Sequence, residues 1–105
     1  ENVTLWHATH DSEWTYDPNL WLATSWEPSG SFMALKKSKS IKFIKLTVKT
    51  NVKGLATCAD PFYKDEKEIL LSHSLVLKRL PNNSPAVSIE GHTFPVLAEY
   101  EVKGL

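Results

Sequence analysis

The residues best suited to chemistry in this chain are two acidic side chains that precede an apolar run. Glu66 and Glu68 come directly before Ile69-Leu70-Leu71, so a carboxylate stands at the start of an otherwise apolar predicted strand. A fixed anion stabilises positive charge, and a sugar that loses its leaving group at the anomeric carbon becomes an oxocarbenium ion. Because residues two apart on a strand share a face, the two carboxylates could divide the roles of cation stabiliser and base.

His7 and an aromatic, hydroxyl-rich stretch are the next candidates, and both have ordinary structural interpretations as well. His7 lies in the predicted strand Leu5-Trp6-His7-Ala8-Thr9, where a histidine is more often structural than functional. Residues 21–32 contain Trp, Thr, Ser and Phe side chains, and the aromatic members of such a stretch usually pack in a core. The residues alone leave both interpretations open.

A dense group of lysines occupies the middle of the chain. It is typical of a solvated surface, but it could instead form a cationic patch for a pyrophosphate, a nucleic acid or an acidic protein. The polar face has no interleaved aromatic residues for base stacking, which disfavours the nucleic-acid interpretation. These lysines, seven of the twelve basic residues, are Lys36, Lys37, Lys39, Lys42, Lys45, Lys49 and Lys53.

Short strands and a short helix are predicted to position these groups. The clearest strand is residues 41–50, where the apolar phase shifts between Phe43 and Ile44 and indicates a bulge or a strand covered on both faces. Alternation from Phe94 to Val102 predicts a strand with one inward face, after a turn at Gly91. A loop over residues 11–19, a helix beginning near residues 27–29, and strands over residues 3–8, 20–24, 68–71 and 75–80 complete the prediction.

Length and composition set the class of the protein. The 105 residues are predicted to form one α+β domain, residues 1–105, of two packed, mostly antiparallel sheets with one or two short helices. A formal net charge of zero excludes a global field toward nucleic acid or membrane. Cys58 is the single cysteine and no Cys/His set has zinc spacing, so neither a disulfide nor a metal is expected. Phosphate-binding glycine loops and a GxSxG nucleophile motif are absent from the sequence.

Taken in order along the chain, three motifs resemble the ADP-ribosyltransferase family, which includes poly-ADP-ribose polymerases and the diphtheria-type and clostridial-type toxins. Leu5-Trp6-His7-Ala8-Thr9 resembles the first-strand motif, in which the family's His binds a ribose hydroxyl at the floor of the NAD pocket. The resemblance gives that role to His7 and places Ala8 and Thr9 beside it. The family normally has Gly where this chain has Ala8.

The second and third motifs extend the resemblance over nearly the whole chain. Asn19 to Phe32 resembles the second motif, with Trp21 at the position of the stacking Tyr and Ser29 at that of the amide-binding Ser. Thr24 and Ser25 alternatively match a Ser-Thr-Ser motif of another branch, and Phe32 takes the place of the second aromatic residue. Glu66-Lys67-Glu68 resembles the Glu-x-Glu motif, which makes Glu68 catalytic and lets Glu66 engage the acceptor.

The resemblance implies an NAD-dependent ADP-ribosyltransferase that releases nicotinamide and transfers ADP-ribose to a macromolecule or small molecule. NAD would be the substrate, no metal would be needed, and we expect a protein acceptor rather than a nucleic acid and no membrane partner. We expect a cytoplasmic protein, or one delivered into a host cytoplasm, whose native N-terminus is not visible because the chain starts at Glu1. Two alternatives are a catalytically silent module that binds through its lysine-rich face, and an RNA 2′-phosphotransferase-like enzyme.

Overall fold

The computed structural model describes residues 2–36, 40–49, 52, 54–56, 68–72 and 75–104, which form a small α+β domain. Within this part of the chain one short helix, α1 (Pro28–Ala34), accompanies nine strands. The strands are β1 (Asn2–Thr9), β2 (Leu22–Ser25), β3 (Lys42–Lys49), β4 (Gly54–Ala56), β5 (Glu68–Leu71), β6 (Val76–Leu80), β7 (Val87–Ile89), β8 (His92–Phe94) and β9 (Val96–Lys103).

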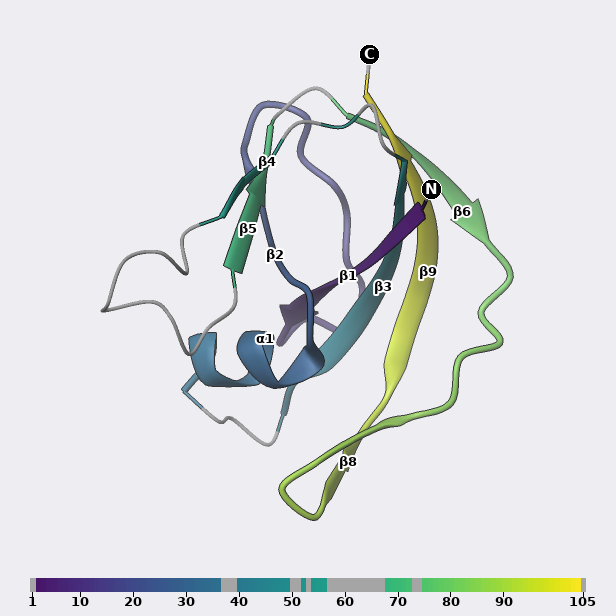
Figure 1. Ribbon diagram of the computed structural model, residues 1–105. Coiled ribbons are helices and arrows are strands. Elements are labelled where there is room, and N and C mark those ends of the chain that lie inside the picture. The colour runs from purple at the N-terminus through teal and green to yellow at the C-terminus, as the bar shows by residue number, and fades with distance from the viewer. Residues whose placement is uncertain are drawn as a thin grey trace.

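Seven of these strands form one sheet, in the order β4-β5-β2-β1-β3-β9-β6, and β7 and β8 form a separate hairpin (Figure 1). Neighbouring strands are antiparallel except β3 and β9, which run parallel. The predicted α+β class, with mostly antiparallel sheets and a short helix, is therefore confirmed. The unequal size of the two sheets was not indicated by the sequence.

Strand β3 is the centre of the domain because both of its faces are covered. Phe43 and Ile44 are both fully buried, on opposite faces of the strand. Ile44 and Leu46 belong to a main core, whereas Phe43 belongs to a second core. The pairing of β3 with β9 also shifts register between Phe43 and Ile44. The change of apolar phase in the sequence was predicted to mean a bulge or a strand covered on both faces, and the structure has both.

Two clusters of buried side chains fill the space on either side of β3. The second core places Phe32 of α1 and Phe94 of β8 with ring centroids 5.3 Å apart, so the helix and the hairpin share it. The main core joins strands from both ends of the sheet, and burying its apolar surface is the dominant favourable contribution to folding. The members of the main core are Leu5, Leu22, Ile44, Leu46, Val48, Leu71, Leu75, Ala98 and Val102.

A proline divides the long strand that was predicted to run from Phe94 to Val102. Phe94 ends β8, Pro95 follows, and β9 begins at Val96. Proline has no N–H for a strand ladder, but its carbonyl oxygen accepts a hydrogen bond of 3.0 Å from the N–H of Phe43. The predicted turn at Gly91 is confirmed: Glu90 and Gly91 have φ of 51° and 81°, as tight hairpin turns require.

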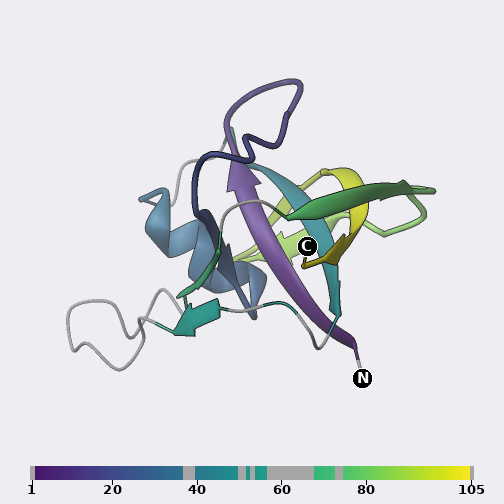
Figure 2. The same ribbon diagram turned by 90° about the horizontal axis from the view of Figure 1, so that it is seen from above.

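Helix α1 begins and ends through backbone geometry rather than through side-chain caps. Glu27 precedes it in an extended conformation, and Pro28 starts it with a ring that fixes φ at a helical value. After Leu35 the chain enters the left-handed region at Lys36, with φ of 57°, which is a common way to end a helix. The helix contacts β1, β2 and β7. Seen from above, α1 lies on one side of β1, and β6 and β9 lie on the other (Figure 2).

Strands β1 and β2 share fewer paired residues than the strand pairs on either side of them. β1 is in register with β3 along its whole length, from Asn2 to Thr9. With β2 it shares a single registered pair, Trp6 with Ser25. β2 is in turn paired with β5 from Leu22 to Ser25. The sheet therefore has a narrow junction at its middle, where β1 and β2 part.

A hydroxyl group on β2 holds this half of the sheet together. Thr24 is 2% exposed, and its Oγ1 donates a hydrogen bond of 2.7 Å to the carbonyl oxygen of Ile69 on β5. We expect Thr24→Val to lower the free energy of unfolding by about 1–2 kcal/mol, because a buried hydrogen bond is lost at nearly constant volume. Chemical denaturation measures this change, with exposed Thr15→Val as the matched control. An equal effect of both substitutions would contradict the structural role of Thr24.

Candidate functional site

A cavity of about 110 Å³ lies where β1, β2, β5 and α1 meet; it is called the small cavity below. Its wall combines one carboxylate, one imidazole and several hydroxyl groups with small apolar side chains. The lining residues are His7, Ala8, Ala23, Thr24, Ser25, Ser31, Leu35 and Glu68. His7, Ala8, Thr24, Ser25 and Glu68 were all predicted from the sequence, so segments far apart along the chain are brought together here.

The order of strands explains this convergence. Glu68 is the first residue of β5 and pairs with Ser25 on β2, and Ser25 pairs with Trp6 on β1. His7 follows Trp6 directly. The row of paired residues across β5, β2 and β1 therefore brings the backbone at Glu68 close to the backbone at His7, although side chains of consecutive residues on a strand leave it on opposite faces.

His7 is held in its neutral form, with one tautomer selected. Its Nδ1 lies 2.7 Å from the carbonyl oxygen of Ala23, and because that oxygen only accepts hydrogen bonds, Nδ1 carries the proton. Burial lowers the pKa of His7 below its ordinary value of 6.5, and the hydrogen bond to Ala23 offsets this only in part. Nε2 is then an unprotonated acceptor, which suits a hydroxyl donor on a ligand.

Two of the hydroxyl groups of the small cavity are engaged by the fold. Thr24 donates to Ile69, as described above, and Ser31 Oγ donates to the carbonyl oxygen of Trp6 over 3.3 Å. Ser31 was missed by sequence reasoning, although Ser31 and Leu35 are four apart and so share one side of the helical turn. This four-residue spacing was the sequence signal that could have placed Ser31 and Leu35 on the same side of the helix.

Three other predicted residues do not line the small cavity. Ser29 Oγ donates to Glu27 over 3.4 Å at the start of α1 rather than lining the small cavity. Phe32 is 3% exposed in the second core, and Thr9 Oγ1 accepts a hydrogen bond from the N–H of Asp11. Glu66 lies outside the described residues. The small cavity therefore brings together predicted residues of β1, β2 and β5, whereas the predicted helix residues Ser29 and Phe32 do not line it.

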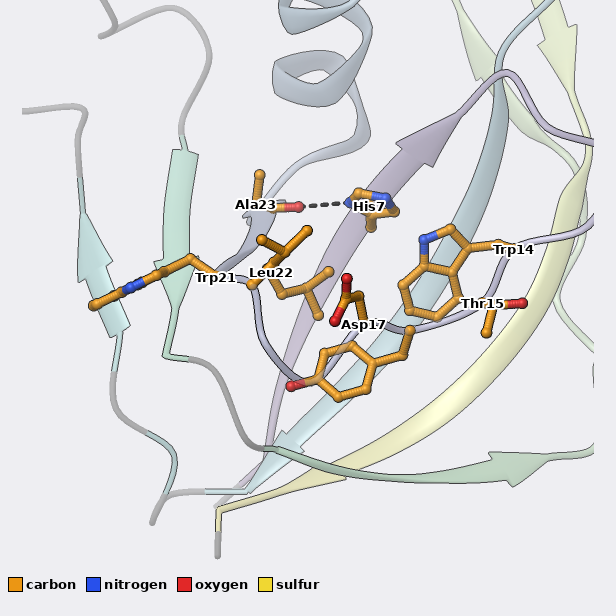
Figure 3. A pocket seen from close by; sticks show the side chains of 9 residues that line it. His7, Trp14, Thr15, Asp17, Trp21, Leu22 and Ala23 are labelled. Atoms are coloured by element: carbon orange, nitrogen blue, oxygen red, sulfur yellow. Dashed lines mark hydrogen bonds between the residues drawn. The ribbon is translucent and has the colours of Figure 1, made fainter.

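A second, larger cavity of about 250 Å³ adjoins the first, and we call it the aromatic cavity (Figure 3). It includes the predicted residue Trp21, which is 51% exposed. In Figure 3 the Asp17 carboxylate points into the space between Leu22 and Trp14, below His7. The lining residues are His7, Trp14, Thr15, Tyr16, Asp17, Leu20, Trp21, Leu22 and Ala23.

The two cavities share His7 and Ala23, so the hydrogen bond between these residues forms part of both walls. Each cavity alone is smaller than the roughly 300–1,000 Å³ typical of small-molecule sites. The formally charged side chains in the two walls are Asp17 and Glu68, both acidic. The combined wall therefore favours a ligand that is neutral or positively charged where it contacts these carboxylates.

Two of the four lysines of this segment that the structure describes, Lys45 and Lys49, are paired with acidic side chains. Lys45 lies 3.8 Å from Glu99, and Lys49 lies 3.6 Å from Glu101, both across the parallel pair β3–β9. Lys42 Nζ donates to the carbonyl oxygens of His10 and Ser40. Lys37, Lys39 and Lys53 lie outside the described residues. Opposite charges on neighbouring strands reduce the field of this face.

Two other kinds of feature are absent from the described residues. Within that part of the chain, no group of three or more His, Cys, Asp and Glu side chains is arranged to hold a metal ion. Among the same residues, no helix has the length and apolar character needed to cross a membrane.

Comparison of the chain with protein-family models, with curated proteins and with solved structures found no match. What this site does must therefore be inferred from its own geometry and chemistry.

The lowered pKa of His7 makes the stability of the protein depend on pH. Well above pH 6.5 His7 is neutral in both the folded and the unfolded chain. As the pH falls below 6.5, the unfolded chain binds a proton first, so the free energy of unfolding decreases until the folded-state pKa is reached. We expect His7→Gln to flatten this decrease, as measured by denaturation over a pH series. His10→Gln, at an exposed imidazole, is the control, and an unchanged slope in His7→Gln would contradict the assignment.

Proposed function

We propose that the protein is an NAD-dependent ADP-ribosyltransferase whose reaction takes place in the small cavity. The observation that carries the proposal is that His7 and Glu68 line one cavity although they come from β1 and β5. These are the two residues to which the resemblance assigns ribose binding and catalysis.

The chemistry follows from the carboxylate. The bond between the anomeric carbon of the ribose and the nicotinamide nitrogen breaks, and nicotinamide leaves with the bonding electron pair. The ribosyl group becomes an oxocarbenium ion, and Glu68 stabilises its positive charge. An acceptor nucleophile then bonds to the anomeric carbon and releases its proton to a carboxylate or to water. His7, neutral and with Nε2 as an acceptor, binds a ribose hydroxyl.

The charge of the wall supports this substrate at the nicotinamide end. The nicotinamide ring of NAD is positively charged, and the charged residues in the walls of the two cavities are acidic. The pyrophosphate needs donors beyond those walls, and Lys36, which is exposed and follows Leu35 directly, is one such cation. An RNA 2′-phosphotransferase would also have to bind an anionic RNA, and the absence of lysine and arginine from the described walls disfavours that alternative.

One observation favours a second candidate, a catalytically silent binding module. Ala8 lines the small cavity, so a methyl group occupies a place where the resembling family has glycine. In a cavity of about 110 Å³ that methyl group takes space from a ligand. The paired Lys45 and Lys49 do not support a lysine-rich binding face for such a module. The two candidates differ in whether nicotinamide is released.

Glu68→Gln tests the enzymatic proposal. Glutamine keeps the size of the side chain and removes its charge, so we expect nicotinamide release and ADP-ribose transfer from labelled NAD to fall by about 10²–10³-fold. NAD binding, measured by calorimetry, should change much less, because the substrate is bound largely by other groups.

The matched control is Glu90→Gln, at an acidic residue in the turn between β7 and β8. We expect it to retain the activity of the unaltered protein. Transfer at an unaltered rate by the Glu68→Gln protein would refute the catalytic assignment. Heat of NAD binding without nicotinamide release by the unaltered protein would instead identify the silent module.

A further inference from the structure

The wall of the aromatic cavity, like that of the small cavity, has one formally charged side chain, and it is acidic. Of its nine lining residues, Asp17 is the one with a formal charge once His7 is neutral. A neighbouring cavity contains both Glu13 and Arg79, and another contains both Lys45 and Glu99, so their charges cancel. The aromatic cavity therefore has a net negative charge that its own wall does not balance.

Two aromatic rings beside this carboxylate are fixed by other contacts. The Trp14 ring lies 5.3 Å from the His7 ring and 5.5 Å from the Tyr100 ring. The Tyr16 hydroxyl oxygen accepts a hydrogen bond of 2.8 Å from the N–H of Leu75, and its ring is tilted by 45° to Trp14. Rings held in this way need little ordering when a ligand binds. Their faces attract cations.

We propose that the aromatic cavity binds a methylated ammonium group. Such a group has a positive charge for Asp17 and the aromatic rings, and methyl groups for the apolar part of the wall, which Leu20, Leu22 and Ala23 provide. A bare ammonium group is strongly hydrated and loses more water than this wall can replace.

Guanidinium is a poorer match for the same site. It binds carboxylates best through two parallel hydrogen bonds, one to each oxygen. Asp17 Oδ1 already accepts a hydrogen bond of 2.9 Å from the N–H of Asn19, so one of its oxygens is engaged by the turn. A methylated ammonium needs a nearby negative charge and van der Waals contact but no pair of hydrogen-bond acceptors, so it suits the cavity better than guanidinium.

The methylated ammonium can come from a free small molecule of the choline type or from a methylated lysine of another protein. The chemistry recognised is the same in both cases. This inference stands on the aromatic cavity alone and does not need the proposed transferase activity.

The test compares a cation with its neutral isostere. Choline chloride and 3,3-dimethylbutan-1-ol, in which carbon replaces the nitrogen, are titrated into the protein while the indole N–H signals of the tryptophans are followed by NMR. We expect choline to shift the Trp14 signal saturably and to bind at least roughly tenfold more tightly than the alcohol. Equal binding of the two compounds, or no saturable shift with choline, would overturn the proposal.

Asp17→Asn tests the carboxylate without removing the turn, because the asparagine side-chain oxygen still accepts the N–H of Asn19. We expect it to weaken choline binding roughly tenfold, whereas Asp11→Asn, at another exposed acid of the same loop, leaves the affinity unchanged. The NMR spectrum of each variant reports whether it is folded. An unaltered affinity in folded Asp17→Asn protein would refute the role of Asp17.

Three further titrations distinguish the two sources of the methylated ammonium and test the competing cations. A short peptide with trimethyllysine that binds more tightly than choline would identify a modified protein as the partner, and the reverse order would identify a free small molecule. The same peptide with unmodified lysine should bind much more weakly. Methylguanidine that binds as tightly as choline would overturn the choice of a methylated ammonium.

Discussion

The hydrogen bond from His7 to the carbonyl oxygen of Ala23 is the constraint on which the site depends. It spans the place where β1 and β2 part, beyond their single registered pair of Trp6 and Ser25. In a fully paired sheet, backbone hydrogen bonds would fill this gap and leave no room for a ligand. A side chain supplies the connection instead, so the sheet remains joined while cavities open beside the junction.

The burial of the same imidazole also affects the charge of both cavities. Burial lowers the pKa of His7 more than its hydrogen bond to Ala23 raises it, so the neutral imidazole adds no positive charge to the wall that it shares between the two cavities. One carboxylate in each wall and a neutral imidazole shared by both suit a ligand that is positively charged where it contacts a carboxylate. The proposals for the small and aromatic cavities both rest on this charge pattern, but each can fail without the other.

The sequence predicted local elements better than the faces that they present. Residues 68–71 match β5, because β-branched and apolar side chains favour strands locally. The phase shift at Phe43 and Ile44 matches the observed bulge. The helix face was harder to predict, since the chain direction after Ser25 decides whether Ser29 or Ser31 reaches the small cavity. Asp17 was read as part of a polar loop, and only tertiary packing places it beside fixed aromatic rings.

Strand β6 has a consequence for how copies of the protein meet. It is an outer strand of the sheet in the described residues, so one row of its backbone groups lies at an edge. Lys78 and Arg79 stand in its middle and are exposed. Two copies that approached edge to edge would bring like charges together before any backbone hydrogen bond formed, which opposes growth of the sheet from one molecule into the next.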